Sequence, residues 1–158
     1  MKAAYLPISS SIGSRPMPDS RAFLDTNVLC YLFGREPEKA AKARALLSEG
    51  PTISVQVLAE LCNVVLRKER LTWREIEDVI AVVGELCDIV PLTLDVQAQA
   101  RAIAARTGYT IYDAQILAAA GKTGCARLWS EDMHYGHRVE AFGIMVEIGN
   151  PFDSSYQG

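Results

Sequence analysis

Acidic residues stand at several points of the chain where carboxylates could serve chemistry. Asp25 ends the short apolar stretch "RAFLD", Asp113 stands near the start of the mostly apolar "IYDAQILAAA", and the pair Glu131–Asp132 follows "CARLWS". Carboxylate oxygens are the ligands that Mg²⁺ and Mn²⁺ prefer. A divalent cation held in this way can activate water and neutralise phosphate charge. The first question is whether the fold brings these acids together.

A further acid, Glu60, lies inside an apolar segment with helical periodicity. Gln56, Glu60, Asn63 and Arg67 are spaced at i, i+4, i+7 and i+11, so they form one polar stripe on a helix. Periodicity alone favours a stripe that faces solvent. Glu60 joins the other acids only if this stripe faces the same cleft.

Each acid taken alone also has a structural explanation. Asp25 can cap the helix that follows it. Thr110 and Asp113 have the T-x-x-D spacing of a capping box, and an acid suits the positive end of a helix. Taken together, three or four neighbouring carboxylates would repel one another, and a divalent cation removes that repulsion. We therefore expect Asp113 to help hold a metal while it also serves the helix terminus.

The elements that must position these acids alternate along the chain. Because strands separated by helices imply a parallel sheet, the sequence predicts an α/β fold of three layers, α/β/α, with a central, mainly parallel sheet. The carboxyl ends of such strands share one edge, where ligands bind. Strands are expected at 21–25, 51–54, 87–92, 125–130 and 143–148, and helices at 26–34, 36–50, 55–70, 72–86, 94–108 and 112–121.

Composition indicates one soluble domain. The chain has 158 residues and a net charge of −3, which argues against binding nucleic acid through bulk positive charge. It contains neither an apolar run of membrane-spanning length nor a signal-peptide core, so a cytoplasmic location is expected. We divide it into an N-terminal arm at 1–20, expected to be flexible, a domain at 21–152 and a tail at 153–158. Four scattered cysteines are expected to be free thiols: Cys30, Cys62, Cys87 and Cys125.

Five segments together resemble the PIN-domain ribonucleases, most closely the VapC-type toxins of toxin–antitoxin pairs. The segments are "FLDTNVL", "ISVQVLAEL", "YTIYDAQILAAA", "LWSEDMHYG" and "NPF", in the order of the family. The acidic quartet of the family falls on Asp25, Glu60, Asp113 and Asp132, as catalytic residues and metal ligands. Its usual Thr before the last acid is Ser130 here. We expect Ser130 and Asn27 to support the quartet from a second shell.

The resemblance implies a PIN-like fold and an endoribonuclease dependent on Mg²⁺ or Mn²⁺ that leaves a 5′-phosphate and a 3′-hydroxyl. It also implies a homodimer, inhibited by a cognate antitoxin protein, that acts as the toxin of a type II system. Two other functions stay open: an RNA-processing nuclease outside a toxin pair, and a metal-free PIN-like module that binds RNA or protein. The RNA cleaved, the antitoxin, the ions used in the cell and the role of 1–20 are not determined by the sequence.

Other enzyme classes fit less well. A phospho-acceptor receiver domain needs an early acidic pair and a late lysine, and a haloacid-dehalogenase-like phosphatase needs D-x-D where this chain has "DTN". The only histidines, His134 and His137, are too few for a zinc site and are expected in a loop near the cleft. A basic cluster could steer RNA, but no aromatic residues alternate with it to suggest base stacking. Its members are Arg67, Lys68, Arg70 and Arg74.

The neighbours Glu131 and Asp132 are expected to play different roles. If the strand before them continued in extended form, successive side chains would point to opposite sides. Ser130 and Asp132 would then share a side, so the Ser130 hydroxyl could bond to the Asp132 carboxylate or to a metal-bound water and fix its orientation. Glu131 would face solvent or a basic neighbour.

Overall fold

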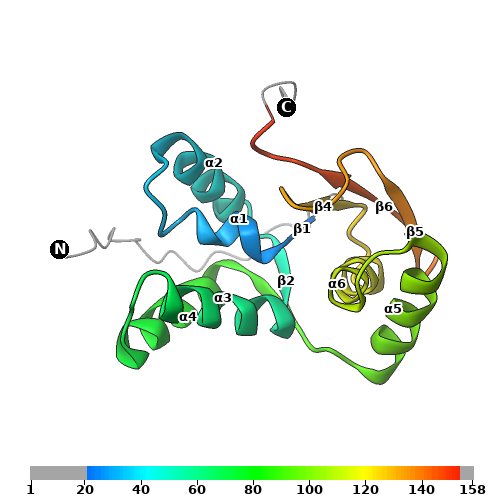
Figure 1. Cartoon of the computed structure of the whole chain (residues 1–158), viewed down its shortest axis with the longest axis horizontal. Coiled ribbons are helices and arrows are strands. Elements are labelled where there is room, and N and C mark those ends of the chain that lie inside the picture. The colour runs from blue at the N-terminus through cyan, green and yellow to red at the C-terminus, as the bar shows by residue number, and fades with distance from the viewer. Residues whose placement is uncertain (1–20, 154–158) are drawn as a thin grey trace.

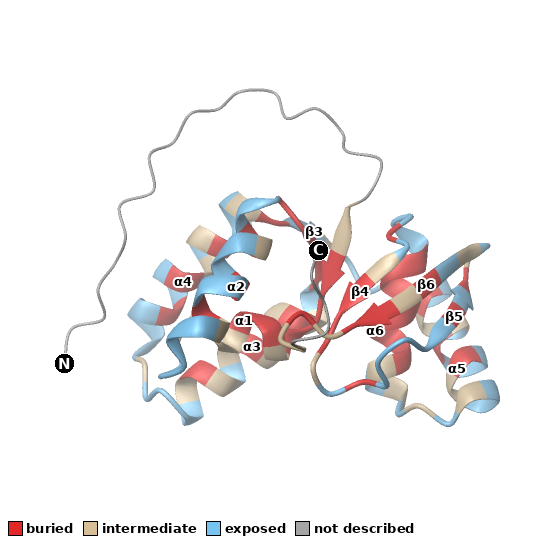
Figure 2. Cartoon of the chain, turned by 90° about the horizontal axis from the view of Figure 1, so that it is seen from above, coloured by how far each residue is buried: buried red, intermediate tan, exposed pale blue. Residues whose placement is uncertain are grey.

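The computed structural model describes residues 21–153, in which a six-stranded sheet separates two groups of helices (Figure 1). The strand order is β3-β2-β1-β4-β6-β5. Helices α1 to α4 lie on one side of the sheet, and α5 and α6 lie on the other (Figures 1 and 2). The predicted α/β/α layering with a mainly parallel sheet is therefore confirmed. The arm at 1–20 and residues 154–158 of the tail lie outside the described part of the chain.

The strands are short, and the helices carry the signals expected at their ends. Ser54 and Thr72 cap the helices that follow them, and Thr72 forms a capping box with Glu75. Gly108 ends another helix in the left-handed conformation, which glycine adopts without strain. The strands are β1 Ala22–Leu24, β2 Thr52–Ser54, β3 Asp88–Val90, β4 Arg127–Trp129, β5 Arg138–Ala141 and β6 Ile144–Gly149. The helices are α1 Thr26–Cys30, α2 Pro37–Ser48, α3 Val55–Arg67, α4 Trp73–Leu86, α5 Leu94–Thr107 and α6 Ile111–Lys122.

The parallel register of the central strands sets the position of the site. Strand β1 pairs in parallel with β2 on one side and with β4 on the other. Leu24, the last residue of β1, lies opposite Trp129, the last residue of β4. Asp25 and Ser130, which follow these two residues, therefore leave the sheet at the same edge. The backbone amide of Asp25 continues the ladder by donating to the carbonyl of Trp129 at 3.0 Å.

One strand was not predicted. Residues 138–141 form β5, which pairs antiparallel with β6 at the edge of the sheet. Its side chains alternate between exposed and buried, the usual pattern of a strand with one face on the core. Phe142 and Gly143 both have positive φ, as a tight two-residue hairpin turn requires. The alternation in "RVEA" followed by "FG" was the signal that the prediction missed.

Helix α6 is apolar because it is buried on most of its surface. Every residue from Ala114 to Gly121 is buried, while the outer faces of α2, α4 and α5 are largely exposed (Figure 2). Gly121 allows the closest approach: a Cβ there would lie 2.4 Å from the carbonyl oxygen of Ala141 in β5. Burial of this helix against α5 and the sheet supplies much of the hydrophobic stabilisation on that side. The two polar residues at its front, Tyr112 and Asp113, are not buried.

All four cysteines lie within residues 21–153 and none forms a disulfide there, as predicted; Cys87 and Cys125 are buried, whereas Cys30 and Cys62 are half-buried. Among residues 21–153, none of the helices combines the length and the apolarity needed to cross a bilayer.

Candidate active site

Asp25 is the most enclosed acid of the site. Its side chain is only 6% exposed, and its Oδ1 accepts a 2.6 Å hydrogen bond from the amide of Thr26 at the start of α1. Its Oδ2 accepts bonds from the Ser130 hydroxyl at 2.7 Å and from the Asn27 amide at 2.9 Å. Burial raises the pKa of Asp25 to about 6; the hydrogen bonds from Ser130 and Thr26 lower it, and the charges of Glu60 and Asp113 raise it. The predicted cap is thus present, on a carboxylate with an unusual proton affinity.

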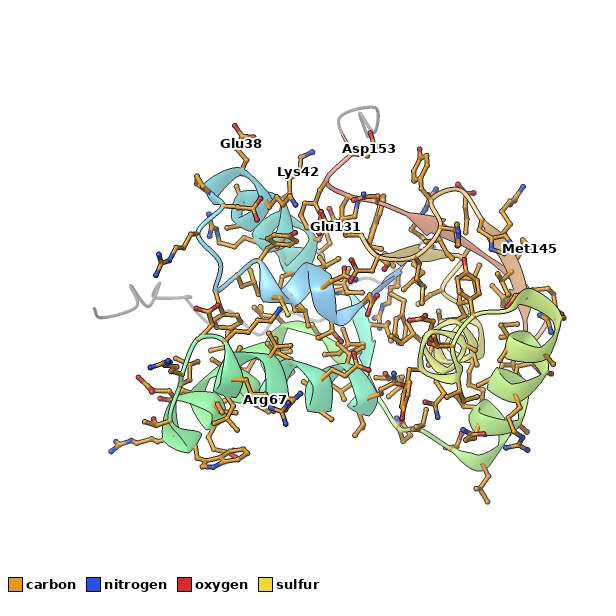
Figure 3. The ribbon with its side chains drawn as sticks, in the orientation of Figure 1. Glu38, Lys42, Arg67, Glu131, Met145 and Asp153 are labelled. Atoms are coloured by element: carbon orange, nitrogen blue, oxygen red, sulfur yellow. The ribbon has the colours of Figure 1, made fainter. Side chains whose placement is uncertain are left out.

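Glu60 faces the site and not bulk solvent. Its Oε2 accepts a 2.9 Å hydrogen bond from the hydroxyl of Thr26, and its Oε1 accepts one of 2.8 Å from the amide of Gln56. The helical stripe therefore has two parts, because Gln56 and Glu60 are half-buried while Asn63 and Arg67 are exposed. Figure 3 shows Arg67 on the side of α3 away from Glu131.

Asp113 takes part in the helix terminus that the sequence predicted. Thr110 caps α6 by accepting from the Asp113 amide at 3.2 Å, and its hydroxyl donates to Oδ2 of Asp113 at 2.9 Å. Burial is the main cause of the raised pKa of Asp25, and the charge of Asp113 raises it further. The amide of Gln56 also reaches the carbonyl oxygen of Tyr112 at 3.2 Å. Gln56 thus connects Glu60 on α3 with the first turn of α6.

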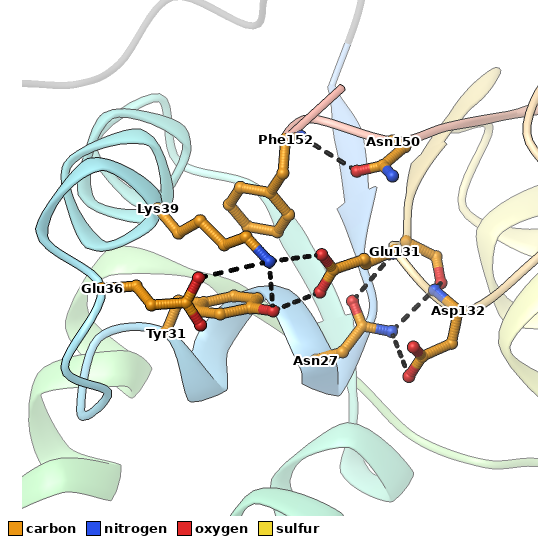
Figure 4. A network of polar contacts seen from close by, with 9 residues as sticks. Asn27, Tyr31, Glu36, Lys39, Glu131, Asp132, Asn150 and Phe152 are labelled. Atoms are coloured by element: carbon orange, nitrogen blue, oxygen red, sulfur yellow. Dashed lines mark hydrogen bonds and ion pairs between the residues drawn. The ribbon is translucent and has the colours of Figure 1, made fainter. Parts of the chain in front are cut away.

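Asn27 connects the remaining acid to the centre of the site. Besides Asp25, its side-chain amide reaches Oδ2 of Asp132 at 3.3 Å and the Ser130 hydroxyl oxygen at 3.1 Å. Its carbonyl oxygen accepts from the backbone amide of Glu131 at 3.1 Å (Figure 4). One asparagine on α1 therefore fixes both Asp25 and the segment that carries Asp132.

The predicted hydrogen bond from Ser130 to the Asp132 carboxylate is not formed. Ser130 is fully buried, and its hydroxyl donates to Asp25 and not to the carboxylate of Asp132. The oxygen of that hydroxyl also accepts from the backbone amides of Asp132 and Met133, both at 3.3 Å. The physical reason is that β4 ends at Trp129 and the chain then bends, so the alternation of an extended strand does not continue.

Glu131 points away from the acids and towards a basic neighbour, as predicted. Lys39 on α2 donates to its Oε1 at 2.6 Å, and the hydroxyl of Tyr31 donates to its Oε2 (Figure 4). Partial burial raises the pKa of Glu131, but the bonds from Lys39 and Tyr31 outweigh burial and lower it. The ammonium group of Lys39 also lies 4.4 Å from the ring centre of Tyr31 and 5.4 Å from that of Phe152. Glu131 therefore attaches the bend after β4 to α2.

Sequence reasoning missed three supports of the site. Thr26 adjoins Asp25 in the "DTN" motif, but its bond to Glu60 joins residues 34 positions apart and has no local signature. Gln56 stands one helical turn before Glu60, a spacing that could have suggested a hydrogen bond. Lys39 carries no local signal, because its contact with Glu131 spans 92 positions.

The side chains present fit a divalent cation by their chemistry. Thr26 and Asn27, which follow Asp25, contact Glu60 and Asp132 respectively. Burial is the main cause of the raised pKa of Asp25, and the charges of Glu60 and Asp113 raise it further, an effect that a cation would oppose. In addition, Oε1 of Gln56 is buried without a hydrogen-bond partner. Among residues 21–153, no three acidic, histidine or cysteine side chains are grouped in ligand geometry. The acids are thus within electrostatic reach of one another without forming a finished coordination shell.

The basic cluster lies at the far end of α3 and the start of α4. Arg67, Lys68, Arg70 and Arg74 are all exposed. Lys68 is near enough to the site for its charge to lower the pKa of Cys30, which burial raises to about 11. The charges of Asp25, Asp132 and Glu60 raise the pKa of the same thiol further.

Comparisons with known proteins agree with this architecture. The model of one protein family, described as the PIN domain, matches residues 22–138. A search of curated proteins finds no match. Solved structures with the same fold include VapC20 of Mycobacterium tuberculosis, described as a sarcin-ricin loop cleaving toxin, with a TM-score of 0.57 and 22% identity over 70% of this chain and 91% of that one.

Two complexes give similar values. A toxin–antitoxin complex from Klebsiella pneumoniae has a TM-score of 0.59 and 23% identity, covering 84% of this chain and 98% of that one. DNA-bound VapBC from Salmonella typhimurium has a TM-score of 0.61 and 22% identity, with coverage of 84% and 98%. At these identities the likenesses show a shared fold.

Proposed function

We propose that this chain, which belongs to the PIN domain family, is a metal-dependent endoribonuclease and the toxin of a type II toxin–antitoxin system. The observation that carries the proposal is the position of Asp25. This buried carboxylate, with a pKa raised to about 6, lies at the edge of the sheet where Glu60, Asp113 and Asp132 also gather. An acidic cluster of this kind is suited to phosphodiester hydrolysis with a hard cation.

The cation, Mg²⁺ or Mn²⁺, would be held by Asp25, Glu60, Asp113 and Asp132. When bound, it would supply charge neutralisation at the phosphate and activation of water. The chain itself orients the carboxylates and binds a proton at Asp25. Because the pKa of Asp25 is raised to about 6, this carboxyl binds a proton more readily than an ordinary aspartate, and a bound cation would favour its ionised form.

The supporting residues fix the geometry of the carboxylates before substrate arrives. Ser130 and Asn27 bind the same oxygen of Asp25, and Thr26 links α1 to Glu60. Hydrogen bonds of this kind orient metal ligands, and their loss lowers metal affinity or activity. Ser130 and Asn27 are therefore proposed as positioning residues, and the four acids as the catalytic ones.

A toxin role, a homodimer and an antitoxin partner are the finer part of the proposal. They are supported by the shared fold with a sarcin-ricin loop cleaving toxin and with toxin–antitoxin complexes. A small neighbouring reading frame whose product forms a complex with this chain and blocks cleavage would identify the antitoxin. The dimer is tested by light scattering of the purified protein.

A cleavage assay tests the chemistry. Purified protein is incubated with total RNA and with single-stranded RNA, with Mg²⁺, with Mn²⁺ and with EDTA. We expect internal cleavage with either metal, no cleavage with EDTA, and no cleavage by the Asp25→Asn variant. Cleavage that persists in both EDTA and Asp25→Asn would show that the activity comes from a contaminant. A folded wild type that binds RNA without cleaving it would favour the metal-free binding module.

Expression in bacteria tests the toxin role separately. We expect the wild type to slow growth and Asp113→Asn to relieve that effect at equal protein level. Because asparagine also tolerates the first turn of a helix, this variant should remain folded. Active nuclease that leaves growth unaffected would instead indicate an RNA-processing enzyme outside a toxin pair.

A further inference from the structure

Three ring side chains that are distant in the sequence meet at one hollow of the surface. Tyr109 lies in the loop between α5 and α6, and His134 and His137 lie in the segment after β4. The ring centres of Tyr109 and His137 are 5.5 Å apart, and those of Tyr109 and His134 are 6.1 Å apart. These rings, with Thr107 and Gly108, line an open hollow of about 300 Å³.

The rings are held in place before any ligand binds. The hydroxyl of Tyr109 lies within hydrogen-bond distance, 2.9 Å, of Nδ1 of His137. Tyr109 is half-buried, whereas both imidazoles are exposed. A ring fixed in this way loses little conformational entropy when a ligand stacks on it.

The hollow lies between two segments that each lead to an acid. Tyr109 stands four positions before Asp113, whose charge is close enough to raise the pKa of the Tyr109 hydroxyl, although burial is the larger cause. His134 stands two positions after Asp132. A chain molecule whose phosphate lies at the acids would therefore pass a neighbouring unit across these rings.

We infer that this hollow is a nucleotide subsite in which one base of the RNA stacks on Tyr109 and the imidazoles of His134 and His137. Single-stranded RNA is recognised mainly by stacking of unpaired bases on tyrosine, histidine and other planar side chains. The exposed imidazole nitrogens can also bond to base edges or to phosphate. This inference rests on the proposed ribonuclease function, because it assigns part of the substrate to a place next to the same acids.

The test compares RNA with and without a base. A labelled single-stranded oligoribonucleotide is titrated with protein in EDTA, so that no cleavage occurs, and binding is followed by fluorescence anisotropy. Matched oligonucleotides carry one abasic position, moved stepwise along the chain. At one position we expect the wild type to bind the intact RNA about 5- to 150-fold more tightly than the abasic RNA, the range for loss of one base–aromatic stack.

Two variants and one control complete the experiment. Tyr109→Ala should bind intact and abasic RNA equally, whereas Tyr109→Phe, which retains the ring, should keep most of the preference. Tyr135→Ala is the matched control, because Tyr135 is an exposed aromatic residue of the same segment that does not line the hollow. Circular dichroism and the melting temperature are measured for each protein, and Tyr109→Phe supplies the comparison if Tyr109→Ala unfolds.

The outcomes separate this inference from the proposed function. If the wild type cleaves RNA with Mg²⁺ but shows no position-dependent preference for a base, the subsite is wrong and the nuclease stands. The subsite is also wrong if Tyr109→Ala keeps that preference. It is equally wrong if Tyr109→Ala binds RNA as the wild type does and is impaired only in binding a protein partner. If the wild type cleaves no RNA, the proposed function itself fails.

Discussion

The hydroxyl of Ser130 donates a 2.7 Å hydrogen bond to Oδ2 of Asp25, across 105 positions of sequence. Neither group is open to solvent, since Ser130 is fully buried and Asp25 is 6% exposed. The bond joins the exits of β4 and β1, and it lowers the pKa of Asp25 against the larger raising effect of burial. It thus keeps a buried carboxylate closer to its ionised, metal-binding form.

Ser130→Ala should shift the pH dependence of cleavage upward. Without the hydroxyl, the pKa of Asp25 rises further above 6, so a higher pH is needed for the ionised form. We expect a several-fold loss of kcat/KM at pH 6.5 that narrows as the pH rises to 8.5. Ser48→Ala, which removes an exposed hydroxyl on α2, is the control. A loss that is equal at every pH would assign Ser130 a purely structural role.

The metal-free protein should lose stability as the pH rises towards neutrality. The pKa of Asp25 is raised in the fold from 3.8 to about 6, so its stabilising proton is fully bound below pH 4 and is lost as the pH passes 6. The difference corresponds to roughly 3 kcal/mol. Urea unfolding of the wild type and of Asp25→Asn in EDTA, between pH 4 and pH 7.5, measures this change in the free energy of unfolding. Parallel curves for the two proteins would contradict the raised pKa.

Divalent metal should stabilise the folded protein. A cation that binds the assembled acids and not the unfolded chain raises the melting temperature by mass action. We expect the melting temperature to rise with millimolar Mg²⁺ or Mn²⁺ for the wild type and to change little for Asp132→Asn. Thermal melts at constant ionic strength make the comparison, with NaCl as the ionic control. A wild-type melting temperature indifferent to both metals would argue against a metal site at these residues.

Asp132 and Glu131 should respond differently to loss of charge. Asp132→Asn should reduce cleavage by orders of magnitude with little effect on stability, because Asp132 is exposed. Glu131→Gln should retain most of the activity but weaken the connection to α2. A double-mutant cycle of Glu131→Gln with Lys39→Met should give a coupling of up to about 1 kcal/mol in unfolding free energy. Severe loss of activity in Glu131→Gln alone would show that the quartet is misassigned by one position.

Gln56→Leu should impair the site while leaving the fold intact. The substitution removes the 2.8 Å bond to Glu60 and the 3.2 Å bond to the carbonyl of Tyr112, so Glu60 is less well oriented. We expect a 10- to 100-fold rise in the Mg²⁺ concentration for half-maximal cleavage, which is the usual cost of losing such a support. Gln97→Leu removes a comparable bond to Arg101 on the surface of α5 and serves as the control. An unchanged metal requirement would leave Gln56 without a role in the site.

Much of the fold followed from local properties of the sequence. The strands predicted at 21–25, 51–54 and 125–130 contain β1, β2 and β4, and each of the predicted helices has its counterpart. These elements are marked by periodicity, by caps such as Ser54 and by glycines such as Gly108. Periodicity and capping act over a few residues, so they can be read without knowledge of the rest of the chain. The parallel arrangement then placed Asp25 and the segment after Trp129 at one edge.

Other features were decided only by tertiary contacts. Periodicity favoured a solvent-facing stripe, and the packing of α3 beside α1 brought Glu60 to Thr26 instead. Because the chain bends after Trp129, Ser130 forms a hydrogen bond with Asp25 and Glu131 forms one with Lys39. These contacts span 34 to 105 positions, and each depends on the register of strands and helices that are remote in sequence.

The cluster of Tyr109, His134 and His137 also could not be predicted from the sequence. The sequence has no aromatic residues interleaved with its basic cluster, and it therefore gave no indication of base stacking. The fold nevertheless brings Tyr109 to His134 and His137, because the loop before α6 and the segment after β4 lie side by side. Residue types and their order determined which carboxylates are available, which residues cap helices and that the sheet is mainly parallel. Packing over long sequence separations determined the partners of each carboxylate, because a hydrogen bond depends on distance in space and not on distance along the chain.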